Sequence, residues 1–299
     1  MLIESIAGAT AAYLAYKAIN EKHIKKIKKL ADDYVKKFNK KVSKEGSVVF
    51  IGQTNAGKTV YFVAMVDQLL RHSEGKYKIT YKDSNTERFV IDNIAKMKKS
   101  GWPLHTVNEA LYEIDLNHKS WGMNHTGTIS FHDHPGDSFE VAFSDPSKKS
   151  ELSTYAGDAL ILRKELIEAK GIILVIDSAV LHEGQSAEFR EVLFNLTTFL
   201  KEVAMQNGKK RIAVIFAKAD LFKGHTDFHP SNVFRDQYTD AYNKLAFMEV
   251  SYYYASAVGE HIINTEGEMM PPSDYNTSKA YNVIEPVLWL LDIKEKDIK

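Results

Sequence analysis

The 299-residue sequence contains no cysteine, only seven prolines and no net charge, because 39 basic side chains balance 39 acidic ones. Without cysteine, disulfide frameworks, cysteine-ligated zinc, iron–sulfur clusters and thiol nucleophiles are excluded, and a reducing or redox-indifferent compartment follows. Hydrophobic residues make up 44% of the chain, which is typical of a soluble globular protein rather than a disordered or fibrous one. The length fits one large domain with an appendage, or two small domains.

The zero net charge is the sum of two opposite charges. Residues 1–45 contain 11 lysines and 5 acidic residues and so carry a net charge of +6, which leaves −6 on residues 46–299. The basic segment suits an anionic cytoplasmic membrane surface, whereas the acidic remainder suits staying off it. No nucleic-acid partner is expected.

The first 20 residues form an apolar stretch of almost membrane-spanning length. Small and apolar residues run from Leu2 to Ile19 and are interrupted by Glu4 and Lys17. A spanning helix needs about 20 such residues, and the lysines that follow would stay on the cytoplasmic side. We therefore expect residues 1–20 to anchor the protein at the cytoplasmic face of a membrane. The alternative is a soluble helix that docks on a partner or on the main domain of a cytoplasmic protein.

Residues 21–45 have the pattern of a basic amphipathic helix. Apolar side chains recur at steps of three and four, which places them on one stripe: Ile24, Ile27, Ala31, Tyr34 and Phe38. The stripe could pack on the main domain, pair with another helix or lie on lipid headgroups. A helix that spaces the domain from the membrane is the simplest interpretation.

A phosphate-binding loop follows the first predicted strand. The β-branched run Ser47–Ile51 leads into Gly52-Gln53-Thr54-Asn55-Ala56-Gly57-Lys58-Thr59 and then into a helical pattern, which is G-x4-G-K-T in its required context. Converging backbone N–H groups would bind phosphate oxygens, Lys58 would contact the β- and γ-phosphates, and the Thr59 hydroxyl would ligate Mg²⁺. The predicted nucleotide-binding residues here are Gly52, Asn55, Ala56, Gly57, Lys58, Thr59 and Val60.

Three more motifs follow, each at the end of a predicted strand. The strand 127–131 precedes Asp133, with Gly136 three residues later, and a strand over 171–177 precedes a long helix predicted from about 183 to 205. The strand 211–217 leads into Lys218-Ala219-Asp220. Residues 252–258 read YYYASAV, and the three tyrosines are expected to belong to a buried strand.

Four motifs in this order resemble the Ras-like P-loop GTPases over about residues 46–292. The resemblance implies an α/β fold, with a mostly parallel six-stranded sheet covered by helices on both faces, and it implies binding of GTP or GDP with Mg²⁺. Asp133 would hold Mg²⁺ through water, and the Gly136 N–H would sense the γ-phosphate.

The same resemblance assigns the base site. Lys218 would stack over guanine, and the Asp220 carboxylate would accept hydrogen bonds from the N1–H and the exocyclic amine. The backbone N–H groups of Ser256 and Ala257 would contact the guanine O6. Ala217 stands where the family has Asn, which weakens the assignment of guanine and leaves relaxed base specificity open.

The switch threonine has to be located by its position before the strand predicted at 111–116, which a turn-rich stretch should join to the strand at 127–131. Thr106 follows a G-x-W-P sequence there and is the predicted switch residue and Mg²⁺ ligand, with Thr86 as the alternative. Residues 76–100 then form an insertion with a strand-like YKITY and a helix.

Lys58, Thr106, Gly136 and Asp137 make up the predicted catalytic set. Asp137 stands where Ras-like enzymes carry a water-positioning Gln, so intrinsic hydrolysis should be slow, stimulated by a partner, or dependent on another group. Asn55 leaves potassium stimulation open.

Two further clusters are expected to be structural. Arg163, Lys164, Glu165 and Glu168 should form the solvated face of a helix. The pair His132 and His134 has no third ligand at a recognisable spacing, so no dedicated metal site is expected there.

The layout is similar to that of signal recognition particle receptor β subunits, which also combine an amino-terminal membrane segment, a G-K-T loop and a V-D-S-A strand end. A prokaryotic GTPase of similar architecture, in a regulatory or defence system, fits as well. The sequence therefore predicts a membrane-tethered GTP switch that presents its switch regions to a protein partner. One alternative is an NTPase that drives a partner. Another is a degenerate scaffold, but this is disfavoured by the intact motif residues Lys58, Thr59, Asp133 and Asp220.

Overall fold

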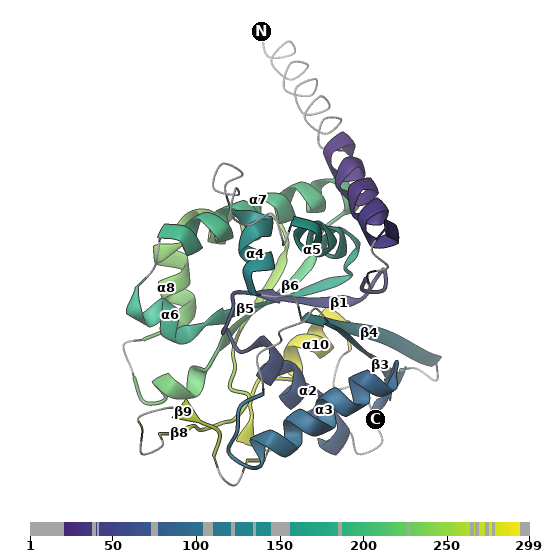
Figure 1. Cartoon of the computed structure of the whole chain (residues 1–299). Coiled ribbons are helices and arrows are strands. Elements are labelled where there is room, and N and C mark those ends of the chain that lie inside the picture. The colour runs from purple at the N-terminus through teal and green to yellow at the C-terminus, as the bar shows by residue number, and fades with distance from the viewer. Residues whose placement is uncertain are drawn as a thin grey trace.

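The computed structural model of the chain describes residues 21–37, 40, 42–72, 77–103, 110–120, 123–133, 136–144, 156–184, 187–225, 228–263, 266, 269–272, 275–276 and 279–293. Seven strands form the main sheet in the order β2-β3-β4-β1-β5-β6-β7 (Figure 1). Their bounds are Val48–Gly52 (β1), Tyr77–Tyr81 (β2), Ala110–Ser120 (β3), Met123–Asp133 (β4), Gly171–Asp177 (β5), Arg211–Ala217 (β6) and Glu249–Tyr254 (β7).

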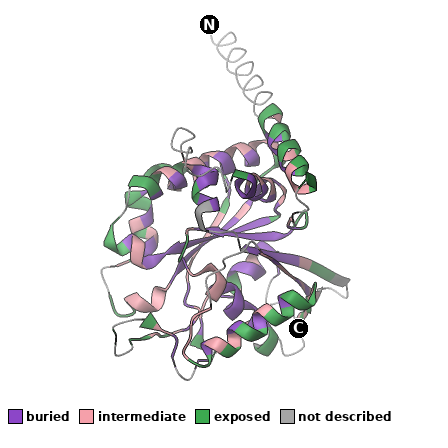
Figure 2. Cartoon of the chain, viewed as in Figure 1, coloured by how far each residue is buried: buried purple, intermediate pink, exposed green. Residues whose placement is uncertain are grey.

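Five neighbouring strands, from β4 through β1, β5 and β6 to β7, are parallel. The central strands β1 and β5 are buried along their whole length, as expected for β-branched runs covered by helices on both faces (Figure 2). Helices α4 (Gly136–Phe143), α5 (Ala156–Glu168) and α7 (Ala187–Asn207) cover one face of the sheet. Helices α2 (Lys58–His72) and α10 (Glu285–Leu290) pack on the other face.

Shorter elements complete the chain. The helix predicted from about 183 to 205 is α7, and the short helix α6 (Ser178–Glu183) precedes it and ends at Gly184, with φ +83°. Helices α8 (Pro230–Gln237) and α9 (Thr239–Leu245) precede β7, and the turn η3 (Ala219–Phe222) follows β6. The small hairpin of β8 (Ile262–Ile263) and β9 (Met269–Met270) follows β7.

The sheet has seven strands rather than the predicted six because the insertion adds one at the edge. The predicted strand and helix of residues 76–100 are β2 and α3 (Ser84–Met97), and β2 pairs antiparallel with β3. The Asp83 side chain caps α3 by accepting the Thr86 N–H at 2.7 Å. The insertion thus supplies an edge strand and a helix that lies beside α2 (Figure 1).

Strands β3 and β4 form a hairpin that is longer than the sequence predicts. Their antiparallel pairing runs from Ala110 opposite Asp133 to Ser120 opposite Met123, so residues 117–120 and 123–126 belong to strands and not to a long turn. Polar side chains support this extension, because the Thr126 hydroxyl donates to Asn117 Oδ1 at 2.6 Å. Cross-strand hydrogen bonds therefore overrode the turn propensity of the individual residues.

The basic segment forms a helix over residues 21–37 that packs on the main domain. Ile24 and Ile27 belong to the hydrophobic core around α5 and α7, and Ala31 is fully buried. Tyr34 lies over Gly157 of α5, where a side-chain Cβ would come within 1.9 Å of the tyrosine ring. The apolar stripe therefore packs on the main domain, which is one of the three locations that the sequence left open. Phe38 lies outside the described residues.

Because this helix covers α5, the charged cluster of α5 is not a solvated face, and that prediction is wrong. Glu165 is 2% exposed, and Lys164 forms ion pairs with Asp32 of the amino-terminal helix and with Glu168. The Arg163 guanidinium lies over the Phe143 ring.

The predicted anchor, residues 1–20, lies outside the described residues. Among the residues that the structure describes, no helix is both long enough and apolar enough to cross a membrane.

Candidate nucleotide-binding site

The predicted motifs meet at one edge of the sheet. Because β4, β1, β5, β6 and β7 are parallel, their carboxyl ends lie side by side. These ends are Asp133, Gly52, Asp177, Ala217 and Tyr254. This edge is where ligands bind in open α/β sheets.

The phosphate-binding loop has the backbone conformation that such a loop requires. Gly52 has φ +151°, and a Cβ there would lie 2.3 Å from the Val175 carbonyl oxygen of β5, so the position accepts glycine alone. Asn55 and Gly57 also have positive φ, +62° and +89°. The loop curls directly into the amino-terminus of α2, whose first turn carries no acidic residue. Such a backbone cradle at a helix start fits a phosphate group.

Lys58 points back across this loop. Its Nζ donates to the carbonyl oxygens of Gly52 at 2.8 Å and Gln53 at 2.6 Å. The ammonium group is thereby held over the concave side of the loop, where it would meet β- and γ-phosphates. Ala56 and Val60 turn their side chains to hydrophobic clusters, so only their backbone could face a nucleotide.

The residues predicted to bind Mg²⁺ are only partly described. Thr59 is the second residue of α2, beside Lys58. Asp133 is the last residue of β4 and Gly136 the first of α4, with Asp137 next, but the side chains of both aspartates lie outside the described residues. Thr106 lies outside them as well.

Thr86, the alternative switch threonine, has a structural role instead. It is fully buried, and its hydroxyl donates to Asp83 Oδ1 at 2.9 Å and accepts the Glu113 N–H at 3.3 Å. These contacts join the cap of α3 to strand β3, so Thr86 is not available to a metal ion.

On the base side, two loops are connected to each other and to the phosphate-binding loop. The Ala219 N–H donates to the Ala255 carbonyl at 3.1 Å, which joins the loops after β6 and β7. The Ala217 methyl group lies 4.0 Å from where a Cβ on Gly57 would stand. The small side chain at the family's Asn position therefore faces the phosphate-binding loop with an apolar group.

Lys218 adopts a left-handed backbone conformation with φ +59°. Its Nζ forms an ion pair with Asp177 Oδ2 at 2.5 Å, and Asp177 also caps α6 by accepting the Ala179 N–H. Asp177 was not among the predicted site residues, although its position at the carboxyl end of β5 was a usable signal.

The Asp220 carboxylate lies in a nearly closed environment, with its side chain 5% exposed. Its Oδ2 is 3.0 Å from His261 Nδ1. Burial, together with the negative charge of Asp220, raises the pKa of Tyr281 to about 12.

The structure corrects the role of Ser256. Its N–H donates to the Tyr281 carbonyl at 3.2 Å in an antiparallel bridge, so this amide is not free to bind the guanine O6. Its buried hydroxyl accepts the N–H groups of Val258 and Gly259 and shapes the loop. The contact predicted for the Ala257 N–H stays a prediction.

Comparison with known proteins agrees with this geometry. A family model described as Double-GTPase 2 matches residues 47–267. The chain belongs to the Double-GTPase 2 family. The match spans the phosphate-binding loop, Asp220 and Ser256, and it confirms a P-loop GTPase of Ras-like type with GTP hydrolysis as its activity. No curated protein is similar to the chain at a significant level.

The comparison also found similar solved structures. Signal recognition particle receptor SRβ with GTP and SRX, from Chaetomium thermophilum, is 14% identical, with 73% of this chain and 93% of that one covered and a TM-score of 0.36. Toc33 from Arabidopsis thaliana with Mg²⁺ and GMPPNP is 13% identical over 91% and 93%, with a TM-score of 0.38. The Ski7 GTPase-like domain from S. cerevisiae, bound to GDP and phosphate, is 16% identical over 82% and 49%, with a TM-score of 0.43.

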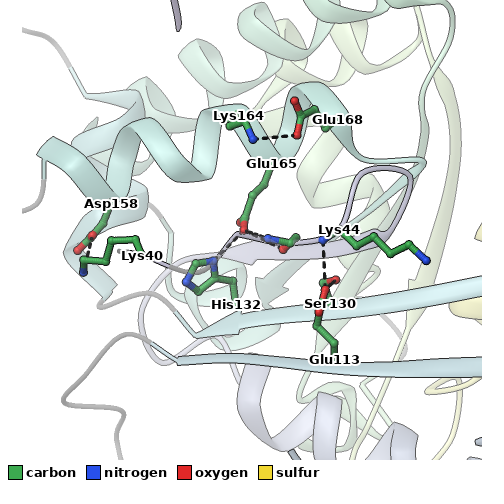
Figure 3. A network of polar contacts seen from close by, with 10 residues as sticks. Lys40, Lys44, Glu113, Ser130, His132, Asp158, Lys164, Glu165 and Glu168 are labelled. Carbon is green, nitrogen blue, oxygen red and sulfur yellow. Dashed lines mark hydrogen bonds and ion pairs between the residues drawn. The ribbon is translucent and has the colours of Figure 1, made fainter. Parts of the chain in front are cut away.

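A buried polar network lies between α5 and the end of β4 (Figure 3). Glu165 of α5 accepts hydrogen bonds from the Ser43 N–H at 2.7 Å and hydroxyl at 2.8 Å, and it lies 2.8 Å from His132 Nδ1. His132 immediately precedes Asp133, so the network joins the segment after the amino-terminal helix to the end of β4. Among the described residues, no cluster of three acidic or histidine side chains could hold a metal ion.

Proposed function

We propose that this Double-GTPase 2 protein is a guanine-nucleotide switch that binds Mg²⁺ with GTP or GDP and presents its switch segments to a protein partner. The observation that carries the proposal is the meeting of two loops at the carboxyl edge of the sheet. Gly57 of the phosphate-binding loop lies near Ala217, and Lys218 and Asp220 follow Ala217 in the chain. When bound, Mg²⁺ neutralises charge on the β- and γ-phosphates, and Thr59 is the described residue that would hold it.

Calorimetric titration with GTP, GDP and ATP tests this proposal. We expect both guanine nucleotides to bind more tightly than ATP, and we expect binding to be lost at micromolar concentrations of a Lys58→Ala variant. Lys99→Ala removes an exposed lysine and serves as the matched control. Unchanged nucleotide binding in Lys58→Ala would refute the site. A preference for ATP would show that the Ala217 position has cost the protein its guanine specificity.

We further propose that intrinsic hydrolysis is slow. The residue after Gly136 is Asp137, whose carboxylate cannot both donate and accept in the way a Gln amide orients water. Single-turnover hydrolysis with and without K⁺ measures this. A rate well above that of a slow switch, with or without K⁺ stimulation, would favour the alternative of an NTPase that drives a partner.

Tethering to the cytoplasmic face of a membrane is the proposed role of the amino-terminal arm. The helix over residues 21–37 buries its apolar stripe on the domain and directs lysines such as Lys22, Lys25, Lys26 and Lys29 outward, which suits an anionic lipid surface. Residues 1–20 would supply the apolar anchor. Flotation with anionic vesicles should recover the full-length protein and not a version lacking residues 1–20. Equal recovery of both versions in the soluble fraction would refute the anchor.

A further inference from the structure

The structure assigns to His261 a role that the motifs do not indicate. We propose that His261 is a positioning residue for base recognition, which holds the Asp220 carboxylate in the orientation that guanine requires. The inference rests on the proposed binding of guanine nucleotides at Asp220 and adds a specificity residue to that site.

The first observation is the contact itself. His261 Nδ1 lies 3.0 Å from Asp220 Oδ2, and the side chains are 23% and 5% exposed. The neighbouring cation does not hold this carboxylate in the same way, because the Lys218 Nζ is engaged with Asp177. A carboxylate on a short turn such as η3 keeps rotational freedom unless a neighbour fixes it.

The second observation is that the loop carrying His261 is itself fixed. Gly259 has φ +73°, and a Cβ at this position would lie 2.1 Å from the Lys279 carbonyl oxygen. The Ser256 hydroxyl accepts the N–H groups of Val258 and Gly259. The backbone just before His261 therefore has a defined path, and the Nδ1 contact follows from that path.

The third step is chemical compatibility. A carboxylate has about four acceptor sites, two on each oxygen. A single donor from His261 occupies one site on Oδ2 and leaves a site on each oxygen for the adjacent N1–H and amine donors of guanine. His261 and guanine can thus bind Asp220 together, so the histidine sets the carboxylate plane without competing for the base.

The position of Ala217 makes this contribution more important. Its methyl group packs near Gly57 and offers no hydrogen bond, whereas the Asn of the family's motif has an amide. His261 lies in the segment that follows β7, and from there its side chain contacts Asp220. The polar contact that fixes Asp220 thus comes from His261, a residue outside the Lys218–Asp220 motif.

The test compares affinities for GDP and IDP, which lacks the exocyclic amine, in wild type, His261→Ala and His261→Asn. We expect His261→Ala to weaken GDP binding about tenfold and IDP binding by a smaller factor, since two-point recognition depends most on the carboxylate plane. His261→Asn retains an amide donor and should restore most of the GDP affinity. The exposed neighbour substitution Glu260→Ala is the control and should leave both affinities unchanged.

A double-mutant cycle separates positioning from a general structural effect. In an Asp220→Ala background, His261→Ala should cause no further loss, because the residue through which it acts is gone. Wild-type affinity in His261→Ala, or equal losses for GDP and IDP, would overturn the inference while leaving the proposed function intact. Failure of the wild type to bind GDP would overturn both.

Discussion

Single residues show where sequence patterns and the folded environment diverge. Glu165 has the sequence surroundings of an exposed helix residue, yet it is 2% exposed and accepts hydrogen bonds from Ser43. The pattern of α5 alone could not reveal this, because the amino-terminal helix that covers α5 comes from more than 100 residues earlier in the chain. A buried carboxylate without its donors would be strongly unfavourable, so this network is a structural requirement.

Glu165→Gln should therefore lower the free energy of unfolding by about 2 kcal/mol, since an amide retains one acceptor oxygen but loses the charge that strengthens the Ser43 and His132 contacts. Urea unfolding measures this change. Glu183→Gln, at an exposed position, is the control and should stay within about 0.5 kcal/mol of wild type. A change as small as that of the control would show that the Glu165 contacts do not stabilise the fold.

Lys210 gives a prediction about pH. Its Nζ donates to the carbonyl oxygens of Ile167 and Ala169 at the end of α5, and burial lowers its pKa to about 8. The unfolded chain binds this proton up to a pH of about 10.5. Between pH 8 and 10.5 the unfolded state therefore holds more protons than the folded state, so this lysine makes stability rise with pH in that window.

The difference in unfolding free energy between wild type and Lys210→Met isolates this effect from the titration of the tyrosines. We expect the difference in unfolding free energy to shift in favour of wild type by about 1–2 kcal/mol from pH 8 to pH 10. Urea unfolding at each pH gives the difference, and Lys209→Met, at an exposed neighbouring position, should show no such trend. A difference that is constant with pH would contradict the lowered pKa.

Among whole elements, buried parallel strands were the most predictable. The strands expected at 171–177 and 211–217 are β5 and β6 with those bounds, because continuous runs of β-branched and apolar residues end abruptly at polar motif residues. The hairpin of β3 and β4 was underestimated, since its extension depends on cross-strand bonds such as Thr126 to Asn117 that no single strand encodes. The sequence also could not show where the apolar stripe of the amino-terminal helix packs, because an amphipathic pattern specifies a buried face and not the surface that covers it.

Gly157→Ala tests the docking of the amino-terminal helix. Alanine favours the α5 helix by up to about 1 kcal/mol, but its Cβ would collide with the Tyr34 ring. We expect the domain to keep its stability while residues 21–37 exchange amide hydrogens at least about tenfold faster, as expected for an element that opens locally. Hydrogen exchange measured by peptide mass spectrometry reports both regions.

Ala156→Ser, on the same helix turn and exposed, should leave the exchange of residues 21–37 unchanged. If Gly157→Ala behaved like this control, Tyr34 would not secure the helix to α5.

For the molecule as a whole, the order of the motifs was enough to predict a Ras-like P-loop GTPase, and the family match confirms it. The placement of Gly52, Lys58 and Asp220 at one edge of the sheet was predictable because each follows a strand end, and parallel strands bring such ends together. The contacts of Asp177 with Lys218 and of His261 with Asp220 were not predictable, since they arise only when separate segments meet in the fold. The helix over residues 21–37, which belongs to the basic segment, is attached to the acidic domain by contacts such as the ion pair of Lys28 with Glu168.

The central claim is that Asp220 reads guanine at the carboxyl edge of this sheet, and the most direct test is calorimetric titration of Asp220→Asn with GDP and XDP. An Asn amide presents one donor and one acceptor, which match the oxygen at position 2 and the N1–H of xanthine and no longer match the two donors of guanine. We predict at least about a hundredfold weaker GDP binding and a gain of XDP binding in this variant. GDP affinity equal to that of wild type, with no binding of XDP, would contradict the account.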